Sequence, residues 1–508
     1  MIARLACGSL HGVDALRVDL EVDFTRQGMP AFTMVGLAEG AVREAKERVF
    51  AALRASGFKL PPARITVNLA PADRRKAGTA YDLPLAIGLL TASGQIPIEK
   101  TEGWFFAAEL SLTGELKPVA GVLPLAMLAR DAGAAGLLTA PDNAAEAAVV
   151  KGLTVRTPQT LGQCVAFLCG SIDLPPASAE PPHEESPPFP LDFSEVKGQV
   201  MAKRALEIAA AGSHNVLLIG PPGSGKTMLA QRLPTILPPL SFEEALDVTR
   251  VYSVAGRLPQ GHGLMTTRPF RAPHHTISEI ALVGGGTHPR PGEVSLAHRG
   301  VLFLDEFPEF HKAALEVLRQ PLEDGVVTIS RAAQSVAYPA ACMLVAAMNP
   351  CPCGYSTDPT HVCTCAPWQI ARYAAKLSGP LLDRIDLHVE VPAVPYEDLR
   401  STQARSTSAE IRQRVLAARA IQQQRYASAG CLCNAALSGS LLEQHCALSA
   451  QGHAVMEHTV RRLGLSARSY TRILRLARTI ADLEGTESLN TDHLLEAVSL
   501  RTLDRETT

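Results

Sequence analysis

The spacing of apolar residues over the first 170 positions switches between a helical and a strand pattern. Gly40–Ser56 carries apolar side chains every three or four residues, which predicts an amphipathic helix, and Gly57 fits its C-cap. Arg64–Leu69 (RITVNL) is typical of a strand. Further helices are predicted at Leu83–Thr91, Pro124–Ala132 and Asn143–Val149, and further strands at Gly136–Thr139 and Leu153–Arg156. The first part of the chain is therefore expected to be a mixed α/β domain.

The second part of the chain begins with short apolar strands and ends in helices. Strands covered on both faces, as in a parallel sheet between two helix layers, are predicted at Asn215–Ile219, Val301–Leu304 and Met343–Ala347. From about Glu397 onward helical spacing dominates. Helices are predicted at His453–Leu463, Arg468–Asp482 and Thr491–Thr502, the last with Thr491 as its N-cap. We expect a three-layer α/β/α core followed by a helical domain.

The segment between these parts differs in composition from both. Residues 171–190 read SIDLPPASAEPPHEESPPFP, which is rich in proline, serine and glutamate. Such a stretch cannot bury enough apolar area to offset its ordering entropy, so we expect a flexible linker. The predicted domains are then 1–170, the linker 171–190, an α/β core over 191–395, and a helical domain over 396–508.

Composition narrows the class of protein. The 508 residues are 46% hydrophobic and 19% charged, with a net charge of −2. This is a globular composition, and its field gives no general attraction to nucleic acid or membrane, so any DNA-binding surface must be a local patch. No apolar run reaches the roughly 18 residues of a membrane span, and charged residues interrupt Met1–Asp23 where a signal peptide would lie. We expect a cytoplasmic protein without a membrane partner.

A glycine-rich turn follows the predicted strand Asn215–Ile219. It consists of Gly220, Pro221, Pro222, Gly223, Ser224, Gly225, Lys226 and Thr227, and a helical run follows it. This order is that of a P-loop, which binds ATP. Its glycines let backbone N–H groups surround the phosphates, its lysine reaches the β- and γ-phosphates, and its threonine hydroxyl serves Mg²⁺. Lys226 and Thr227 take these two roles here.

Two carboxylates follow the apolar strand Val301–Leu304. Asp305 can hold the Mg²⁺ shell, and Glu306 can orient and polarise the attacking water. Strands often end in solvated acids, so the pair gains its meaning from the P-loop before it. Together the two motifs predict hydrolysis of ATP to ADP and phosphate with Mg²⁺ as the cofactor.

The order of these motifs resembles the AAA+ ATPases of the group that contains magnesium chelatase and the minichromosome maintenance helicases. That resemblance places Asn349 at the sensor-1 position, Arg384 within Gly379–Asp386 at the arginine finger, and Arg468 within Leu465–Arg468 at sensor 2 of a helical lid. It implies that Arg384 neutralises the transition-state charge in an adjacent subunit's site. We therefore expect a homo-oligomeric ring, most simply a hexamer.

The whole chain resembles the YifB/ComM proteins, which are magnesium-chelatase-like ATPases. The segments that carry the resemblance are Arg268–Thr276, Val283–Gly286, Pro291–Gly300 and Asn349–Gly354. Within this family, ComM resembles a hexameric helicase that drives DNA branch migration during natural transformation. The resemblance thus implies DNA, both single-stranded and branched, as the partner.

Four of the eleven cysteines crowd into residues 351–365. Cys351, Cys353, Cys363 and Cys365 form two short pairs that can converge on one tetrahedral Zn²⁺. An iron–sulfur cluster could use the same four thiolates, and free thiols are the plainer alternative. We expect a structural zinc site in an insertion of the core. The other cysteines are interpreted as structural.

Part of the N-terminal domain resembles the Lon protease domain, which has the ribosomal protein S5 domain 2-like fold. The resemblance runs through Ser111–Pro124 and the following helix and strand. It places Leu123 where Lon has its catalytic lysine and Thr79 where Lon has its serine. A hydroxyl without its base is not activated, so we expect a domain without peptidase activity.

Several basic residues are candidates for contacts with DNA phosphates. Arg74, Arg75 and Lys76 form a compact basic loop, and Arg271 belongs to a basic group flanking the Gly284–Gly286 loop. That group also contains Arg268, His274, His275, His288 and Arg290. Val326–Arg331 and Gln334–Tyr338 can form a hairpin with Arg331 near its tip. In the related helicases such a hairpin projects into the channel.

Three functions from different classes fit these observations. The first is a DNA-translocating motor that moves recombination intermediates. The second is a magnesium-chelatase-type motor that remodels a protein partner without DNA; the Lon-like domain and the cysteine cluster are foreign to its usual pattern. The third is an ATP-dependent protease or scaffold, against which Leu123 argues.

Overall fold

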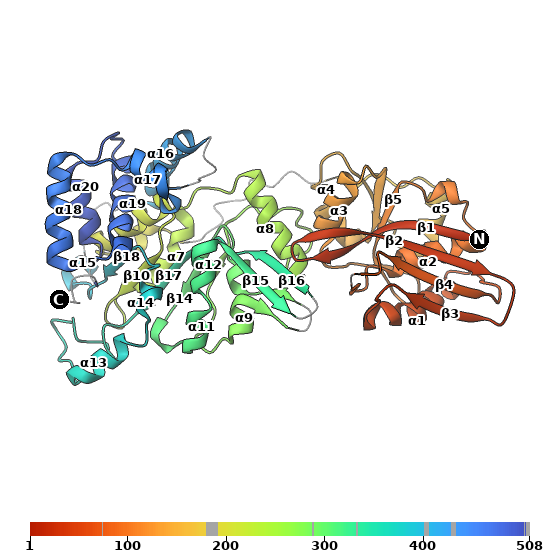
Figure 1. The fold of residues 1–508 in the computed structure, drawn as a ribbon, viewed down its shortest axis with the longest axis horizontal. Helices are drawn as coiled ribbons and strands as arrows, with labels where there is room; N and C mark the ends of the chain where they lie inside the picture. The colour runs from red at the N-terminus through yellow and green to blue at the C-terminus, as the bar shows by residue number, and fades with distance from the viewer. Residues whose placement is uncertain are drawn as a thin grey trace.

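The computed structural model describes residues 1–73, 75–178, 191–286, 289–331, 334–400, 406–427, 433–501 and 503. Two α/β modules lie end to end, and a helical region covers the far end of the second (Figure 1). Across these ranges no helix combines the length and the apolarity needed to cross a bilayer. The mixed α/β architecture, the parallel sheet and the C-terminal helical region confirm the predicted fold class.

The N-terminal module is built on a seven-stranded sheet of order β3-β4-β2-β1-β5-β8-β9. Its strands are β1 (Ile2–His11), β2 (Asp14–Thr25), β3 (Ala31–Val35), β4 (Arg64–Ala70), β5 (Trp104–Ala107), β8 (Gly136–Thr139) and β9 (Thr154–Arg156). β1, β2 and β4 pair antiparallel, and the flanking strands pair parallel. The predicted strand alternates as expected, because Ile65, Val67 and Leu69 point into the core. A short ribbon is formed by β6 (Glu109–Leu110) and β7 (Leu116–Lys117).

Helices cover this sheet close to their predicted positions. They are α1 (Gly40–Ala55), α2 (Asp82–Ser93), α3 (Val122–Asp131), α4 (Ala144–Ala148) and α5 (Leu161–Leu168), with η1 (Ile98–Lys100) and η2 (Pro141–Asn143) between them. α1 buries one apolar face, whereas α2 is buried along almost its whole length. A Cβ at Gly88 of α2 would lie 2.7 Å from Leu5 and 2.8 Å from Val22, so glycine permits this close packing on the sheet.

The described part of the predicted linker follows the N-terminal module. Ala177 N donates to Val155 O at 2.9 Å, which adds the backbone of this segment to the edge strand β9. Arg156 donates to the carbonyl of Leu174. Residues 171–178 are therefore held by hydrogen bonds, and 179–190 lie outside the described residues.

The second module is built on a five-stranded parallel sheet of order β11-β14-β17-β10-β18. Its strands are β11 (Phe270–Arg271), β14 (Val301–Leu304), β17 (Met343–Met348), β10 (Val216–Ile219) and β18 (Leu387–Glu390). β10, β14 and β17 are buried at every position, as their continuous apolar runs predicted. Because the strands are parallel, all loops that follow them emerge at one edge of the sheet.

Helices and short connections surround this sheet. The helices are α6 (Val200–Gly212), α7 (Lys226–Ile236), α8 (Phe242–Ala255), α9 (Glu279–Val283), α10 (Glu293–Leu296), α11 (Lys312–Glu316), α12 (Arg319–Asp324), α13 (Pro367–Ala374), α14 (Gly379–Leu382) and α15 (Tyr396–Arg400). Two 3-10 turns, η3 (Phe193–Glu195) and η4 (Phe307–Glu309), and a ribbon of β12 (Gly284–Gly285) with β13 (Arg290–Pro291) complete the connections.

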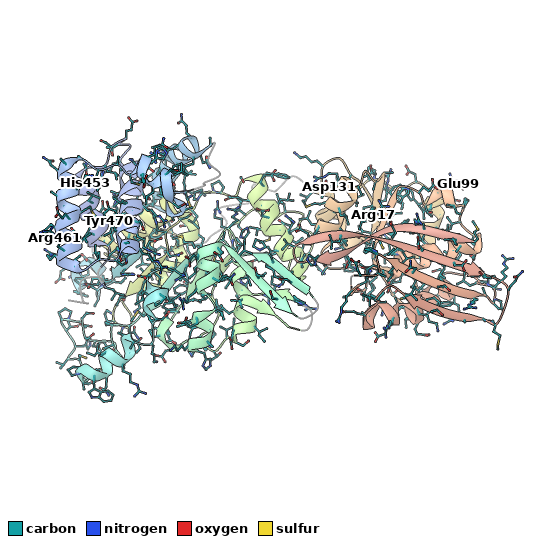
Figure 2. All side chains as sticks on the ribbon, in the orientation of Figure 1. Arg17, Glu99, Asp131, His453, Arg461 and Tyr470 are labelled. Atoms are coloured by element: carbon teal, nitrogen blue, oxygen red, sulfur yellow. The ribbon has the colours of Figure 1, made fainter. Side chains whose placement is uncertain are left out.

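The C-terminal region is helical, as predicted. It comprises α16 (Ser408–Tyr426), η5 (Asn434–Ala436), α17 (Gly439–His445), α18 (Ala450–Leu463), α19 (Ala467–Leu483) and α20 (Thr491–Ser499). Its buried residues share one hydrophobic cluster with the core sheet. α18 turns His453 and Arg461 outward at the far end of the molecule (Figure 2). The predicted N-cap of α20 is wrong by one residue: the Asn490 side chain accepts the bond from His493 N, and Thr491 is the first helical residue.

A β-hairpin meets the N-terminal module. β15 (Val326–Arg331) and β16 (Gln334–Pro339) pair antiparallel, and the Arg331–Gln334 pair closes the hairpin, as predicted. The turn between β1 and β2 packs on its stem, where a Cβ at Gly12 would lie 2.9 Å from Ala337 O. Val13 packs into the hydrophobic cluster beneath the same hairpin.

Helix α8 makes the second contact between the modules. Gly121 N donates to Ser253 O at 3.0 Å, and the Ser253 hydroxyl donates to Glu146. Arg250 of the same helix pairs with Asp14 of β2. These polar contacts and the Gly12 turn fix the N-terminal module against α8 and the hairpin.

Candidate nucleotide site

The P-loop lies at the carboxyl edge of the parallel sheet, between the end of β10 and the start of α7. Its backbone requires glycine at several places. Gly223 and Gly225 have φ of +76° and +93°, which side-chain-bearing residues rarely adopt. A Cβ at Gly220 would lie 2.0 Å from Val391 O, the residue after β18. The predicted P-loop therefore follows β10 and packs closely against the residue that follows the neighbouring strand β18.

Lys226 brings together both ends of the predicted site. Its ammonium donates to Gly220 O at 2.7 Å, Pro221 O at 2.9 Å and Asn349 Oδ1 at 3.2 Å. Burial lowers the pKa of Lys226, and the nearby Asp305 carboxylate opposes that shift. The contact with Asn349, at the end of β17, places the predicted sensor-1 residue beside the P-loop lysine.

The predicted magnesium ligands also meet. Thr227 Oγ1 donates to Asp305 Oδ2 at 2.7 Å, which joins the first turn of α7 to the end of β14. A threonine hydroxyl and a carboxylate are oxygen ligands of the kind that Mg²⁺ prefers. The two residues therefore fit the ion that the motif implies.

Glu306 stands next to this pair in a strained backbone conformation. Its φ is +52°, in the left-handed region that is uncommon for a residue with a side chain. Its carboxylate is 60% exposed and lies 3.0 Å from His275 Nδ1. The sequence grouped His275 with basic residues around a glycine loop, and the structure places it instead against the predicted catalytic carboxylate. In the sequence, the two adjacent histidines of the Arg268–Thr276 segment are the only signal that relates to this contact between His275 and Glu306.

The four clustered cysteines converge beside the P-loop. Their sulfur atoms all lie within 4.8 Å of one another. The sulfur of Cys353 is 3.3 Å from that of Cys351 and 3.6 Å from that of Cys363. A tetrahedral site with zinc–sulfur bonds of about 2.3 Å has sulfur–sulfur edges of about 3.8 Å, so the arrangement fits one ion. Backbone N–H groups of Tyr355 and Thr364 lower the pKa of Cys353 to about 5, whereas burial and the neighbouring thiols raise the pKa of Cys363 and raise that of Cys365 to about 12.

The cysteine cluster contacts the nucleotide loop through a glycine. Gly354 has φ of +91°, and a Cβ there would lie 2.6 Å from the ring of Pro222. The first cysteine, Cys351, is fully buried and follows Asn349 by two residues. The cluster thus abuts both the P-loop and the strand end that carries Asn349.

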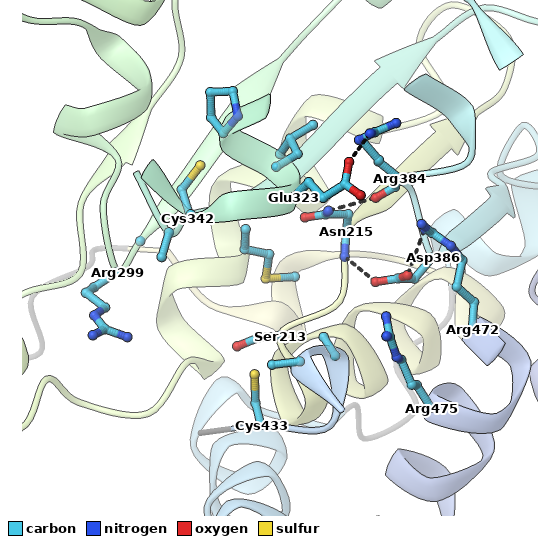
Figure 3. A pocket seen from close by; sticks show the side chains of 18 of the residues that line it. Ser213, Asn215, Arg299, Glu323, Cys342, Arg384, Asp386, Cys433, Arg472 and Arg475 are labelled. Carbon is cyan, nitrogen blue, oxygen red and sulfur yellow. Dashed lines mark hydrogen bonds and ion pairs between the residues drawn. The ribbon is translucent and has the colours of Figure 1, made fainter. Parts of the chain in front are cut away.

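Arg384 and Arg468 lie at the opposite edge of the sheet. Arg384 precedes β18, whereas the P-loop follows the parallel strand β10. Arg384 and the P-loop are therefore separated by the length of a strand, roughly 13 Å. Both arginines line a cavity of about 680 Å³ between the core and the helical region, and Figure 3 shows Arg384 in its lining. Arg384 pairs with Glu323 and donates to Pro380 O at 2.6 Å. The structure does not bring them to their own subunit's P-loop.

The residues predicted to contact DNA differ in their exposure and in their pairing. Lys76 is wholly buried, and its ammonium donates to the carbonyl of Pro71, so its proposed contact with DNA is wrong. Arg271 Nε donates to Glu293 at 2.6 Å, and that pair neutralises its charge. Arg75 is exposed, with Glu39 at 3.5 Å. Arg74 and the side chain of Arg331 lie outside the described residues.

The N-terminal module holds no lysine at the position expected from Lon. Leu123 is fully buried in the cluster beneath α3, and its backbone N–H donates to Glu146 Oε1 at 2.9 Å. At the position where Lon has its catalytic lysine, this chain therefore has a leucine side chain that packs in the hydrophobic core. Thr79 lies at the turn before α2 and is partly exposed.

Taken together, the parallel sheet, the P-loop with its carboxylate pair, and the C-terminal helical region define an AAA+ ATPase. Models of the magnesium chelatase subunit ChlI match residues 20–143 and 192–399, and a model of its C-terminal region matches 405–501. The competence protein ComM of Haemophilus influenzae is 48% identical over 499 residues, which cover 97% of this chain and 96% of ComM. The chain belongs to the YifB/ComM family of magnesium-chelatase-like proteins.

Two further relatives delimit the match. YifB of Salmonella typhimurium is 44% identical over 495 residues, which cover 97% of this chain and 96% of YifB. The magnesium-chelatase 38 kDa subunit of Rhodobacter capsulatus is 28% identical over 182 residues, which cover only 32% of this chain. The likeness to ComM and YifB therefore extends over both modules, whereas the pairwise match to this chelatase subunit covers 32% of the chain.

Proposed function

We propose that the protein is an ATP-driven ring motor that binds DNA and moves branched recombination intermediates. The observation that carries the proposal is the full-length similarity to a competence protein, ComM, supported by the contacts of Lys226 with Asn349 and of Thr227 with Asp305. Natural transformation is the process in which such a motor acts.

The first step is ATP hydrolysis at the carboxyl edge. Lys226 exchanges its loop carbonyls for the β- and γ-phosphates when ATP binds, and Asn349 orients it. Thr227 and Asp305 would hold Mg²⁺, which would supply positive charge to neutralise the phosphates. Glu306 turns from His275 to orient the attacking water.

The second step is assembly into a ring. Arg384 and Arg468 face away from their own P-loop, so they serve catalysis only if a neighbouring subunit presents its nucleotide to them. Such contacts between two different faces repeat head to tail and close into a ring, for which six subunits are the simplest expectation in this family. The four cysteines would hold a zinc ion beside the P-loop, where Gly354 packs on Pro222, and the ion would stiffen that side of the loop.

The third step is the choice of DNA as the moved partner. The β15–β16 hairpin precedes the sensor-1 strand β17, the place from which related helicases project a hairpin into their channel. Arg75 remains a surface cation, and Arg331 and Arg74 remain candidates by sequence. Backbone contacts of this kind read phosphate rather than base edges, so we expect little sequence preference.

Branch migration of a labelled three-strand junction tests the proposal. The wild-type chain with ATP and Mg²⁺ should displace the labelled strand, and Glu306→Gln, which keeps the site but loses the water-activating carboxylate, should not. A chain that hydrolyses ATP but neither binds single-stranded or branched DNA at low salt nor moves the junction would overturn the DNA assignment. Remodelling of a protein partner, as by a magnesium-chelatase-type motor, would then be favoured.

A further inference from the structure

The cavity at the amino edge of the parallel sheet carries an excess of positive charge. Seven arginines and four carboxylate residues line it, drawn from the core and from the helical region. Figure 3 shows that several of these side chains project into the same space. A cavity of about 680 Å³ with such a lining is suited to an anion of some size, such as the terminal phosphates of a nucleotide.

Most of the arginines are already matched. Five of the seven are held by carboxylate, hydroxyl or carbonyl oxygens of neighbouring elements, as Arg472 is by Asp386 at 3.1 Å. Arg468 is 63% exposed, and its Nη1 lies 3.9 Å from Asp383. For Arg475 no hydrogen bond or ion pair of the guanidinium is found within the described ranges, and its Nε is buried. Arg468 and Arg475 thus have the weakest pairing of the seven, although the charge of Arg475 also acts on Asp386.

These two arginines lie on one face of the same helix. Seven residues separate them on α19, which is about two turns and roughly 10 Å of rise. Figure 3 shows Arg475 directed from α19 toward the cavity, with no dashed interaction reaching it, whereas Arg472 between them contacts Asp386. A buried guanidinium donor without a partner is costly, so the site is electrostatically incomplete in an isolated subunit.

We propose that Arg475 is a phosphate-binding residue for the nucleotide of a second copy of this chain. The anion cannot be the subunit's own ATP, because the P-loop lies at the other edge of the sheet. Arg384 stands in the same cavity, paired to Glu323, and an incoming phosphate competes with that carboxylate. The assignment rests on the proposed ring, and it adds a third arginine to Arg384 and Arg468, which the family resemblance placed at the arginine finger and at sensor 2.

Steady-state kinetics of single variants test the residue. Arg475→Gln should lower kcat roughly ten- to a hundredfold with little change in nucleotide affinity, and Arg475→Lys should recover part of the rate because it restores the charge. Arg461→Gln is the matched control, since Arg461 lies 79% exposed on the outer face of α18 (Figure 2). Thermal melting checks that each variant is folded. Wild-type kcat in folded Arg475→Gln would overturn the proposal.

Subunit mixing separates this proposal from the ring on which it rests. Arg475→Gln supplies an intact P-loop, and Lys226→Ala supplies an intact arginine face, so their mixture should exceed the ATPase rate of either parent. The pair Arg384→Ala with Lys226→Ala serves as the reference. Restoration by the reference pair alone would refute a trans role for Arg475 and leave the ring standing. Restoration by neither pair would refute the ring itself.

Nucleotide stoichiometry distinguishes a neighbour's ATP from free ATP in the cavity. Titration with a non-hydrolysable ATP analogue should give one site per wild-type chain, and Lys226→Ala should bind none. Binding of the analogue by Lys226→Ala that Arg475→Gln in the same chain removes would show an independent nucleotide site. That outcome would overturn the assignment to a second copy.

Discussion

At the scale of single residues, the nucleotide site divides its work between a cation and a carboxylate. Lys226 and Glu306 lie on different loops, and no described contact joins their side chains. We predict that Lys226→Ala abolishes ATP binding, because the β- and γ-phosphates lose their only P-loop cation, while Glu306→Gln binds ATP normally and loses hydrolysis by at least about a hundredfold. Equilibrium binding and single-turnover hydrolysis measure the two effects. Normal turnover by Glu306→Gln would contradict the assignment.

The neighbouring residues Arg75 and Lys76 give a matched pair for the DNA question. Lys76 is buried against a backbone carbonyl, so Lys76→Ala should lower the free energy of unfolding by about 1–3 kcal/mol without acting on DNA directly. Arg75→Ala should leave the stability unchanged and weaken DNA binding modestly, because Arg75 is exposed. Denaturant unfolding and a DNA-binding titration at low salt check both. A folded Lys76→Ala chain with selectively weakened DNA binding would reverse this interpretation.

At this scale, the sequence predicted which residues belong to the nucleotide site better than it predicted which side chains contact one another. The P-loop, Asp305 and Glu306 follow from local spacing, because a strand, a turn and a helix suffice to place them. The burial of Lys76 and the pairing of Arg271 with Glu293 depend on elements distant in sequence, which no local pattern encodes. The role of His275 depends likewise on β11 delivering its loop beside β14.

At the scale of elements, the cysteine cluster is the clearest case of long-range order around the nucleotide loop. We predict about one Zn²⁺ per chain in protein purified without chelator, bound by the four sulfur atoms that lie within 4.8 Å of one another. Elemental analysis measures it. Cys353→Ser should lose the metal, whereas Cys169→Ser, at an exposed cysteine outside the cluster, should keep it. Iron with acid-labile sulfide, or no metal, would refute zinc.

Removal of the metal should also weaken the binding of ATP. Gly354 packs on Pro222, so loss of the metal frees the turn that supports the P-loop. We expect Cys353→Ser to bind ATP several-fold more weakly, with little change in the thermal stability of the N-terminal module. Nucleotide titration of the two cysteine variants compares the effect. Unchanged ATP affinity in a metal-free chain would show that the cluster supports the core elsewhere.

The elements themselves were largely predictable, with errors at their ends. Buried strands such as β10 and β17 announce themselves by unbroken apolar runs, and α1 by its amphipathic spacing. The start of α20 shifted by one residue because Asn490 and Thr491 are both good caps, and only the fold decides which side chain meets the free N–H. The hydrogen bond from Ala177 to β9, inside a proline-rich stretch, likewise had no local pattern.

At the scale of the whole molecule, the P-loop and Arg384 lie at opposite edges of the ATPase sheet. We predict that the chain forms a ring, most simply a hexamer, that tightens with ATP, because the nucleotide bridges the P-loop of one copy and Arg384 of the next. Native mass spectrometry with and without a non-hydrolysable analogue checks this. A monomer that hydrolyses ATP at full rate under dilution would contradict it.

DNA binding by such a ring should depend steeply on salt. The net charge of −2 gives no long-range attraction, so affinity must come from local phosphate contacts that release counterions. For single strands, the logarithm of affinity should fall with the logarithm of salt by a slope of about −0.7 per phosphate contacted. Titrations at several salt concentrations measure the slope. A flat dependence would mean that phosphate contacts do not hold the DNA.

The turn at Gly12 has a consequence for how force is carried. Because that turn sits on the hairpin stem, and Val13 shares the hydrophobic cluster beneath it, the hairpin cannot swing as a free lever. In the proposed motor, a movement of the hairpin would carry the N-terminal module with it. That module also contacts α8 through Ser253 and Arg250. Each subunit of the proposed motor would therefore tilt the whole N-terminal module, and two contacts rather than a two-stranded ribbon would bear the load.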